Sequence, residues 1–259
     1  MSPVLTDQKA AAAEYSELDD SLVRPLVRDL HKTNHAIFWT DLLLSCLAGW
    51  AAFYGAVVLP AFSPQAITAT FISVFCLYRA LCFVHEISHQ THRSLPGFEA
   101  AYNALVGFPF LMPSFVYVGV HQSHHKISVY GTEGDPEYLP FAHSWLMSTT
   151  FALESFFIPV ILLLRFLILA PMGLISPRFH HWLVVHASSL TMNVKYRREA
   201  TAELIGKVRY GSIVILLLWG TCVTLALRGV LPWRVFGIWF IVCSITSFIN
   251  TLRTLGAHA

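Results

Sequence analysis

Long apolar stretches separated by short polar links dominate the pattern of this chain. A membrane-spanning helix needs about 20 mostly apolar residues. Four stretches approach or exceed that length, at residues 37–62, 66–84, 211–231 and 235–252. The link inside each pair is short and contains a proline, which favours a tight reversal. We therefore expect an all-α, polytopic membrane protein whose four transmembrane helices form two hairpins.

A fifth apolar stretch, residues 141–175, is long enough to span but is interrupted. It contains two charges, Glu154 and Arg165, and two prolines, Pro159 and Pro171. A proline inside a helix removes a backbone donor and favours a kink or a break. We expect an interfacial pair of helices broken at Pro159 or Pro171.

The distribution of basic residues predicts the orientation. They cluster at residues 195–209, and the positive-inside tendency makes that cluster cytosolic. The uncharged link at 60–65 then lies on the opposite side, and residues 85–138 are cytosolic. Both ends of 141–175 lie on one face, so this stretch crosses an even number of times. Residues 100–118 are apolar but also begin and end on the cytosolic side, so we expect them to be interfacial as well. A cytosolic histidine-rich cap is expected beside the bilayer.

Composition agrees with a membrane protein. Hydrophobic residues make up 55% of the chain and charged residues only 12%, whereas a soluble domain has about 25% charged residues. The five cysteines lie in apolar stretches without a CxxC pair, which excludes a disulfide scaffold. Residues 1–36 are polar and lack the apolar core of a signal peptide. We expect a cytosolic tail there and one membrane domain over 37–259.

Six of the thirteen histidines fall in two short strings that suit metal binding. At about 100° per residue on a helix, the members of each string point to within about 60° of a common direction. Imidazole is a common ligand of zinc, copper and iron. The first string is His85, His89 and His92, and the second is His121, His124 and His125.

A seventh candidate ligand, His258, lies just after the last apolar stretch, on the predicted cytosolic side. It follows Asn250 and Thr254 at four-residue steps, so the three form one helical stripe. Two other groups are assigned no metal role. His180, His181 and His186 are interpreted as interfacial residues facing headgroups, and His31, His35 and His143 as incidental.

The two strings resemble the first two histidine boxes of the membrane fatty acid desaturase and hydroxylase family. His85-x3-His89 is followed by His121-x2-His124-His125, and residues 250–258 resemble family sequence that precedes a third box. The resemblance implies a four-helix scaffold with two irons held by these histidines. It also implies O₂-dependent removal of two hydrogens from an acyl chain. The third box lies beyond Ala259, so we expect a fragment that is inactive by itself.

Partners and supporting residues follow from the same resemblance. The substrate is expected to be a long-chain acyl lipid from the adjacent bilayer, with no role for nucleic acid. No flavin, haem or iron–sulfur motif is visible, so electrons are expected from a ferredoxin or a cytochrome b5-like protein. Carboxylates often orient metal-binding histidines. Candidate supporting residues are Glu86, Asp135, Glu137 and Asn250, although Asp135-Pro136-Glu137 is also typical of a simple turn.

Three alternatives remain open. Within the same family the reaction could be hydroxylation or ketolation. His85-Glu86-x2-His89 also matches the HExxH motif of zinc proteases, with Glu86 as the general base, but the second string then has no role. The third alternative is a non-catalytic membrane scaffold that retains only vestigial histidine boxes.

Overall fold

The computed structural model describes residues 33–90, 94–138, 144–189, 193 and 195–257. All regular structure in those residues is helical, with no strand among them. The chain forms two units, Met1–Phe38 and Trp39–Ala259, and the second unit is described below. The expected all-α class is confirmed.

Five helical runs in the described residues are long and apolar enough to cross a membrane. Four of them coincide with the stretches expected from sequence, and the fifth is Trp145–Ile175. The protein is therefore an integral membrane protein, while the four-span topology stays a prediction. The four expected helices are α3 (His35–Val58), α4 (Pro64–His89), α11 (Ala202–Leu227) and α12 (Arg234–Ala257).

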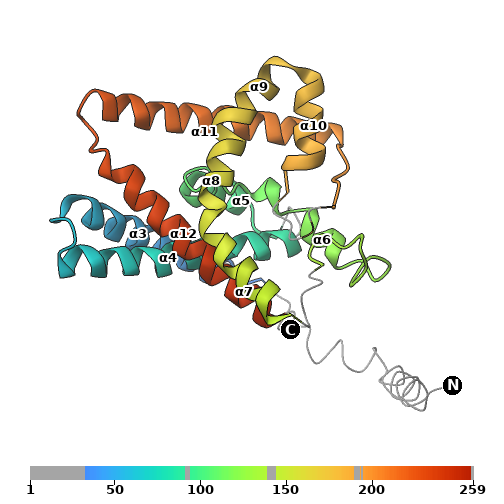
Figure 1. Ribbon diagram of the computed structural model, residues 1–259, viewed down its shortest axis with the longest axis horizontal. Helices are drawn as coiled ribbons and strands as arrows, with labels where there is room; N and C mark the ends of the chain where they lie inside the picture. The colour runs from blue at the N-terminus through green and yellow to red at the C-terminus, as the bar shows by residue number, and fades with distance from the viewer. Residues whose placement is uncertain (1–32, 91–93, 139–143, 190–192, 194, 258–259) are drawn as a thin grey trace, which may run out of the picture. The chain divides into compact units, whose positions relative to one another are not determined.

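The run Trp145–Ile175 changes helix type instead of breaking at its prolines (Figure 1). Pro159 and Pro171 each lie in the first turn of a new α-helical piece, where a missing N–H costs no helical hydrogen bond. Short 3₁₀ and π turns precede those pieces. The pieces are α7 (Trp145–Glu154), η3 (Ser155–Phe157), α8 (Ile158–Leu163), η4 (Leu164–Leu169) and α9 (Ala170–Ile175). The next helix, α10 (Pro177–Ala187), folds back onto α9.

The first hairpin is closed by a capped turn and a close helix contact. Ser63 caps α4 by accepting a hydrogen bond at Oγ from the Ala66 N–H at 3.1 Å, and Pro64 occupies the first turn. Farther along the pair, a Cβ added to Gly49 would lie 2.6 Å from Cγ of Leu77, which is fully buried. Gly49 therefore lets α3 and α4 approach closely, as small residues do between membrane helices.

Replacing Gly49 with alanine is expected to destabilise the hairpin. The new methyl group would displace Leu77, and overpacking of this kind costs about 1–3 kcal/mol. Gly55→Ala is the matched control on the same helix, because its Cβ would meet Ala69 at an ordinary 3.6 Å. Thermal unfolding in one detergent should show a lower midpoint for Gly49→Ala only. Equal midpoints would contradict this packing.

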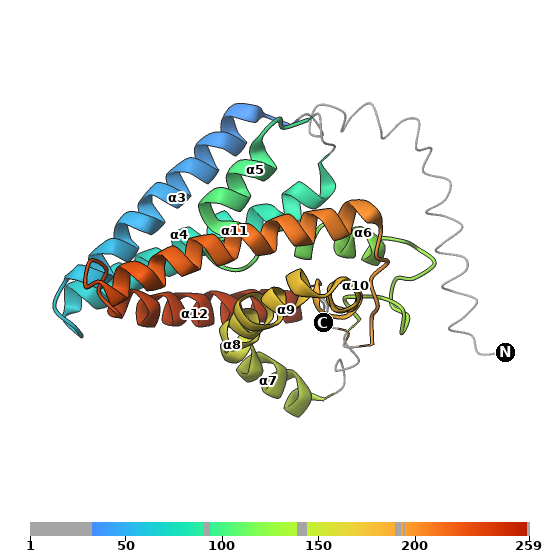
Figure 2. The same ribbon diagram turned by 90° about the horizontal axis from the view of Figure 1, so that it is seen from above.

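A short segment after α4 dips between the long helices. It begins with α5 (Phe98–Tyr102) and continues through the π turn η1 (Asn103–Gly107). The ring of Phe98 lies edge-on to both Trp39 of α3 and Phe83 of α4, each with centroids 5.3 Å apart. In Figure 2, α5 lies between the diverging ends of α3 and α4.

Two tryptophans hold the inner part of that segment. The indole N–H of Trp50 donates to the Leu105 carbonyl at 2.9 Å, and that of Trp239 donates to the Pro109 carbonyl at 3.0 Å. These bonds satisfy carbonyls that would otherwise be costly to bury among apolar helices. The chain then returns through η2 (Ser114–Val116) to α6 (Val120–His124).

Candidate metal centre

The first histidine string forms the last turn of α4. His85 and His89 are four residues apart and therefore lie on one face of the helix, with ring centroids 4.7 Å apart. The helix ends at His89, and the next residue, Gln90, has an extended backbone but still donates its N–H to the Glu86 carbonyl at 3.1 Å. Both imidazoles are thereby placed at the end of a candidate membrane span.

The second string occupies a helix of only five residues. Gly119 precedes α6 with φ of 85°, a conformation that favours glycine, and so redirects the chain into the helix. His121 and His124 are buried, and His125 caps the end of α6. A hydrogen bond of 2.8 Å from Gln122 Nε2 to the Ser88 carbonyl ties α6 to the end of α4.

The two strings converge. Ligand atoms of His85, His89 and His121 all lie within 4.8 Å of one another. Nε2 of His121 lies 3.1 Å from Nε2 of His89 and 2.9 Å from Nε2 of His125. A metal bonded to imidazole nitrogens at about 2.0–2.1 Å would hold adjacent nitrogens about 2.8–3.4 Å apart. The observed distances between the Nε2 atoms therefore suit nitrogens that bind one metal ion.

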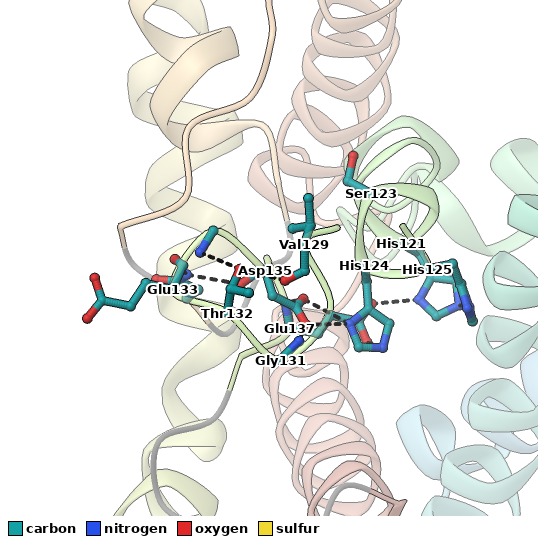
Figure 3. A network of polar contacts seen from close by, with 12 residues as sticks. His121, Ser123, His124, His125, Val129, Gly131, Thr132, Glu133, Asp135 and Glu137 are labelled. Carbon is teal, nitrogen blue, oxygen red and sulfur yellow. Dashed lines mark hydrogen bonds and ion pairs between the residues drawn. The ribbon is translucent and has the colours of Figure 1, made fainter. Parts of the chain in front are cut away.

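In three of these histidines, a carboxylate faces Nδ1, the ring nitrogen other than Nε2. Nδ1 of His121 lies 2.6 Å from Glu137 Oε1, and Nδ1 of His124 lies 2.8 Å from Asp135 Oδ1 (Figure 3). Glu86 Oε1 lies at a longer 3.4 Å from Nδ1 of His85. A carboxylate accepts hydrogen bonds, so in a neutral ring Nδ1 carries the hydrogen and Nε2 keeps its lone pair. Such partners orient histidines for a metal.

The carboxylate of Asp135 accepts several hydrogen bonds. It accepts from the N–H groups of Gly131 at 2.9 Å and Glu137 at 2.8 Å, as well as from His124. Burial raises its pKa, but these hydrogen bonds outweigh burial and lower the pKa overall. Asp135 is therefore ionised at neutral pH. Because the folded pKa is depressed, this stabilisation is lost only as pH falls through that value.

Within the second string, the neutral form of the His125 imidazole is favoured. Burial, followed by the neighbouring His121 and His124, lowers the pKa of His125. A neutral ring keeps its lone pair, which a metal requires. The donor set is thus imidazole nitrogen supported by carboxylates, which fits iron, zinc or copper.

Comparison with known proteins defines the family. The family model for fatty acid desaturase matches residues 61–259. The chain belongs to the fatty acid desaturase family. It is also 35% identical over 248 residues to a ceramide hydroxylase of Caulobacter vibrioides (strain NA1000 / CB15N). That match covers 93% of this chain and 69% of the relative. No solved structure matches.

The resemblance inferred from the histidine boxes is therefore confirmed, and with it a lipid desaturase or hydroxylase type of activity. The desaturase family uses a di-iron centre, and the described imidazoles provide suitable iron ligands. Two predicted ligands, His92 and His258, lie outside the described residues. The ligand assignments themselves stay predictions.

The other predicted residues differ in their positions. Glu86 and Asp135 lie beside histidine nitrogens, as described above. Asn250 is exposed on α12. His180, His181 and His186 lie on α10, where His180 Nε2 contacts the Ile205 carbonyl at 3.1 Å instead of the cluster.

Sequence reasoning missed Tyr117 as a neighbour of the desaturase-family site. Its hydroxyl lies 2.9 Å from Nδ1 of His121, and its ring stacks on that imidazole with centroids 4.9 Å apart. Burial raises the pKa of this phenol, which therefore stays protonated. A signal existed, since Tyr117 stands four residues before His121 and can lie on the same helical side.

Removing the carboxylates is expected to weaken metal binding without abolishing it. Loss of such an outer partner typically costs about 10–100-fold in metal affinity. Glu137→Gln and Asp135→Asn should each show that loss, and Glu133→Gln is the matched control because its exposed side chain lies on the same loop. Titration of the metal-depleted protein with Co²⁺ measures the affinity. Unchanged affinity in both variants would argue against an orienting role.

Proposed function

We propose that this protein is an O₂-dependent lipid oxidoreductase whose histidine strings hold a di-iron centre and whose reaction is hydroxylation of an acyl chain. The proposal rests most directly on the convergence of Nε2 atoms from His89, His121 and His125. When bound there, iron would supply the O₂ chemistry needed to attack an unactivated C–H bond. The ligands assigned are His85, His89, His92, His121, His124, His125 and His258.

The roles of the protein's own groups follow from their positions. Glu137 and Asp135 accept hydrogen bonds from Nδ1–H of His121 and His124, and these bonds keep the two rings from rotating away from the site. Glu86 supports His85 in the same way at longer range. His85 and His89 end a candidate membrane span, so the site adjoins the bilayer and a long acyl chain can approach it laterally.

Hydroxylation is favoured over desaturation by the relative at 35% identity, which is named a ceramide hydroxylase. Hydroxylation inserts one oxygen atom of O₂ into a C–H bond and releases the other as water, with two electrons and two protons consumed. A ceramide or a similar amide-linked acyl lipid is the proposed substrate. An external ferredoxin or cytochrome b5-like protein would supply the electrons on the cytosolic face.

Desaturation is the second candidate, supported by the description of the family model. It consumes the same O₂, electrons and protons, but removes two hydrogens and releases both oxygen atoms as water. The ligand arrangement is compatible with either outcome, because both begin with the same C–H bond.

Lipid mass spectrometry separates the two candidates. The full-length gene is expressed in a host that lacks the activity and supplies ceramides, and extracted lipids are compared with an empty-vector culture. The proposal predicts ceramide species that have gained one oxygen atom, with label from ¹⁸O₂ gas. Species that have lost two hydrogens and carry no label would favour desaturation. An unchanged lipid profile in cells with folded, iron-loaded protein would contradict both.

A further inference from the structure

Two buried residues that follow α10 contact the backbone just before α6 and the backbone of the loop that supplies the carboxylates. They are Asn193 and Arg198, each 9% exposed. The sequence placed Arg198 in the basic cluster at 195–209, but the structure buries it. Neither side chain offers a typical iron ligand, so their contacts suggest a different role.

Arg198 holds the start of the histidine helix. Its Nη2 donates to the Val118 carbonyl at 2.6 Å, and its Nη1 donates to the carbonyls of Phe115 and Ser188. Val118 lies two residues before the first residue of α6. Burial lowers the pKa of Arg198 to about 10, so the guanidinium remains charged at neutral pH. One planar cation thus binds three carbonyls and joins the segment before α6 to the residue that follows α10.

Gly119 makes this approach feasible. A Cβ at this position would lie 3.2 Å from Arg198 Nη2, and the φ of 85° disfavours other residues. The turn that starts α6 is therefore built around the guanidinium.

Asn193 holds the loop that supplies the carboxylates. Its Nδ2 donates to the carbonyls of Glu133 at 2.7 Å and Asp135 at 2.9 Å, and its backbone N–H donates to Pro136 at 3.1 Å. The side chains of this same loop, Asp135 and Glu137, contact Nδ1 of His124 and His121.

We propose that Asn193 and Arg198 are positioning residues that set the distance between the histidine helix α6 and the carboxylate loop 131–137. A helix of five residues is not stable alone, so its orientation depends on outside contacts. Because both residues belong to one short stretch of chain, they fix the two elements relative to each other. A misplacement of about 1 Å is enough to impair a metal or catalytic site. This inference rests on the proposed metal-binding function.

The neighbouring arginine provides a matched control. Arg197 is exposed, and its guanidinium donates to the Tyr196 carbonyl at 2.8 Å. Arg197→Gln removes the same charge one residue away. A purely electrostatic effect of the basic segment would appear in both arginine variants.

The experiment measures Co²⁺ binding to purified, metal-depleted protein in detergent, by its visible absorption spectrum. The variants are Arg198→Gln, Arg198→Lys, Asn193→Ala and Arg197→Gln. We expect Arg198→Gln and Asn193→Ala to bind about 10–100-fold more weakly, the range seen for outer-sphere partners, with altered spectra. Arg198→Lys should recover only part of the affinity because one ammonium cannot replace the planar fork. Arg197→Gln should match the wild type.

The outcomes separate the two proposals. If the wild type binds Co²⁺ and folded, monodisperse Arg198→Gln and Asn193→Ala bind equally well with unchanged spectra, the positioning role is wrong. Should Arg198→Gln fail to fold, Asn193→Ala decides alone, since it removes the two hydrogen bonds from Nδ2 to the loop. A wild type that binds no Co²⁺ would overturn the proposed metal function and this inference with it.

Discussion

Replacing His121 with alanine is expected to abolish metal binding and lipid oxidation together. Its Nε2 is the atom that approaches both His89 and His125, and its Nδ1 meets the buried Glu137. The substitution removes a ligand and also removes the imidazole that contacts a buried carboxylate at 2.6 Å, which is costly. We expect iron content near zero and product at the empty-vector level, a loss well beyond the about 100-fold of an outer partner.

The control for this variant is a histidine outside the cluster. His181 is exposed on α10, so His181→Ala should retain iron and activity. Iron per chain is measured by mass spectrometry of the purified protein, and product by lipid analysis of the same cells. Retained iron and product in His121→Ala would show that this residue is not a ligand.

Metal removal is expected to have a comparably large effect. Anaerobic treatment with an iron(II) chelator should reduce product formation to background, because attack on an unactivated C–H bond needs a redox-active metal with O₂. Added Fe²⁺ should restore activity, whereas Zn²⁺ should not, since zinc has no redox chemistry. The measurement is oxidised lipid per protein, with reductant and donor supplied in excess.

Peptide-bond hydrolysis that depends on zinc, without any oxidised lipid, would favour the HExxH alternative. In that case Glu86 would be a general base, and one zinc would be bound by His85 and His89. The structure gives Glu86 a different neighbour, because its Oε1 lies 3.4 Å from Nδ1 of His85. The second string also surrounds the same point, which a single protease zinc does not require.

Much of the scaffold could be predicted from the sequence because hydropathy and helical periodicity are local properties. Apolar length identified α3, α4, α11 and α12, and the four-residue spacing of His85 and His89 placed them on one face. Local patterns did not predict that Trp145–Ile175 forms one continuous helical run. Its charge Arg165 is buried, and Nε donates to the Ala187 carbonyl of α10, a contact that no local pattern reveals.

The site required contacts between distant parts of the chain, which spacing alone does not determine. The sequence suggested that the second string faces one direction, but not that Gly119 turns α6 toward the end of α4. Asp135 and Glu137 were compatible with a turn, and the structure shows a turn whose side chains also meet His124 and His121. Arg198 gave no signal beyond its charge, since burial depends on the folded loops around it.

The most direct test of the account is anomalous X-ray diffraction at the iron edge from crystals of the purified protein. The account predicts two iron peaks, with Nε2 of His89, His121 and His125 at bonding distance from at least one of them. The absence of iron at these nitrogens in iron-loaded protein, or a single peak at the zinc edge only, would contradict it.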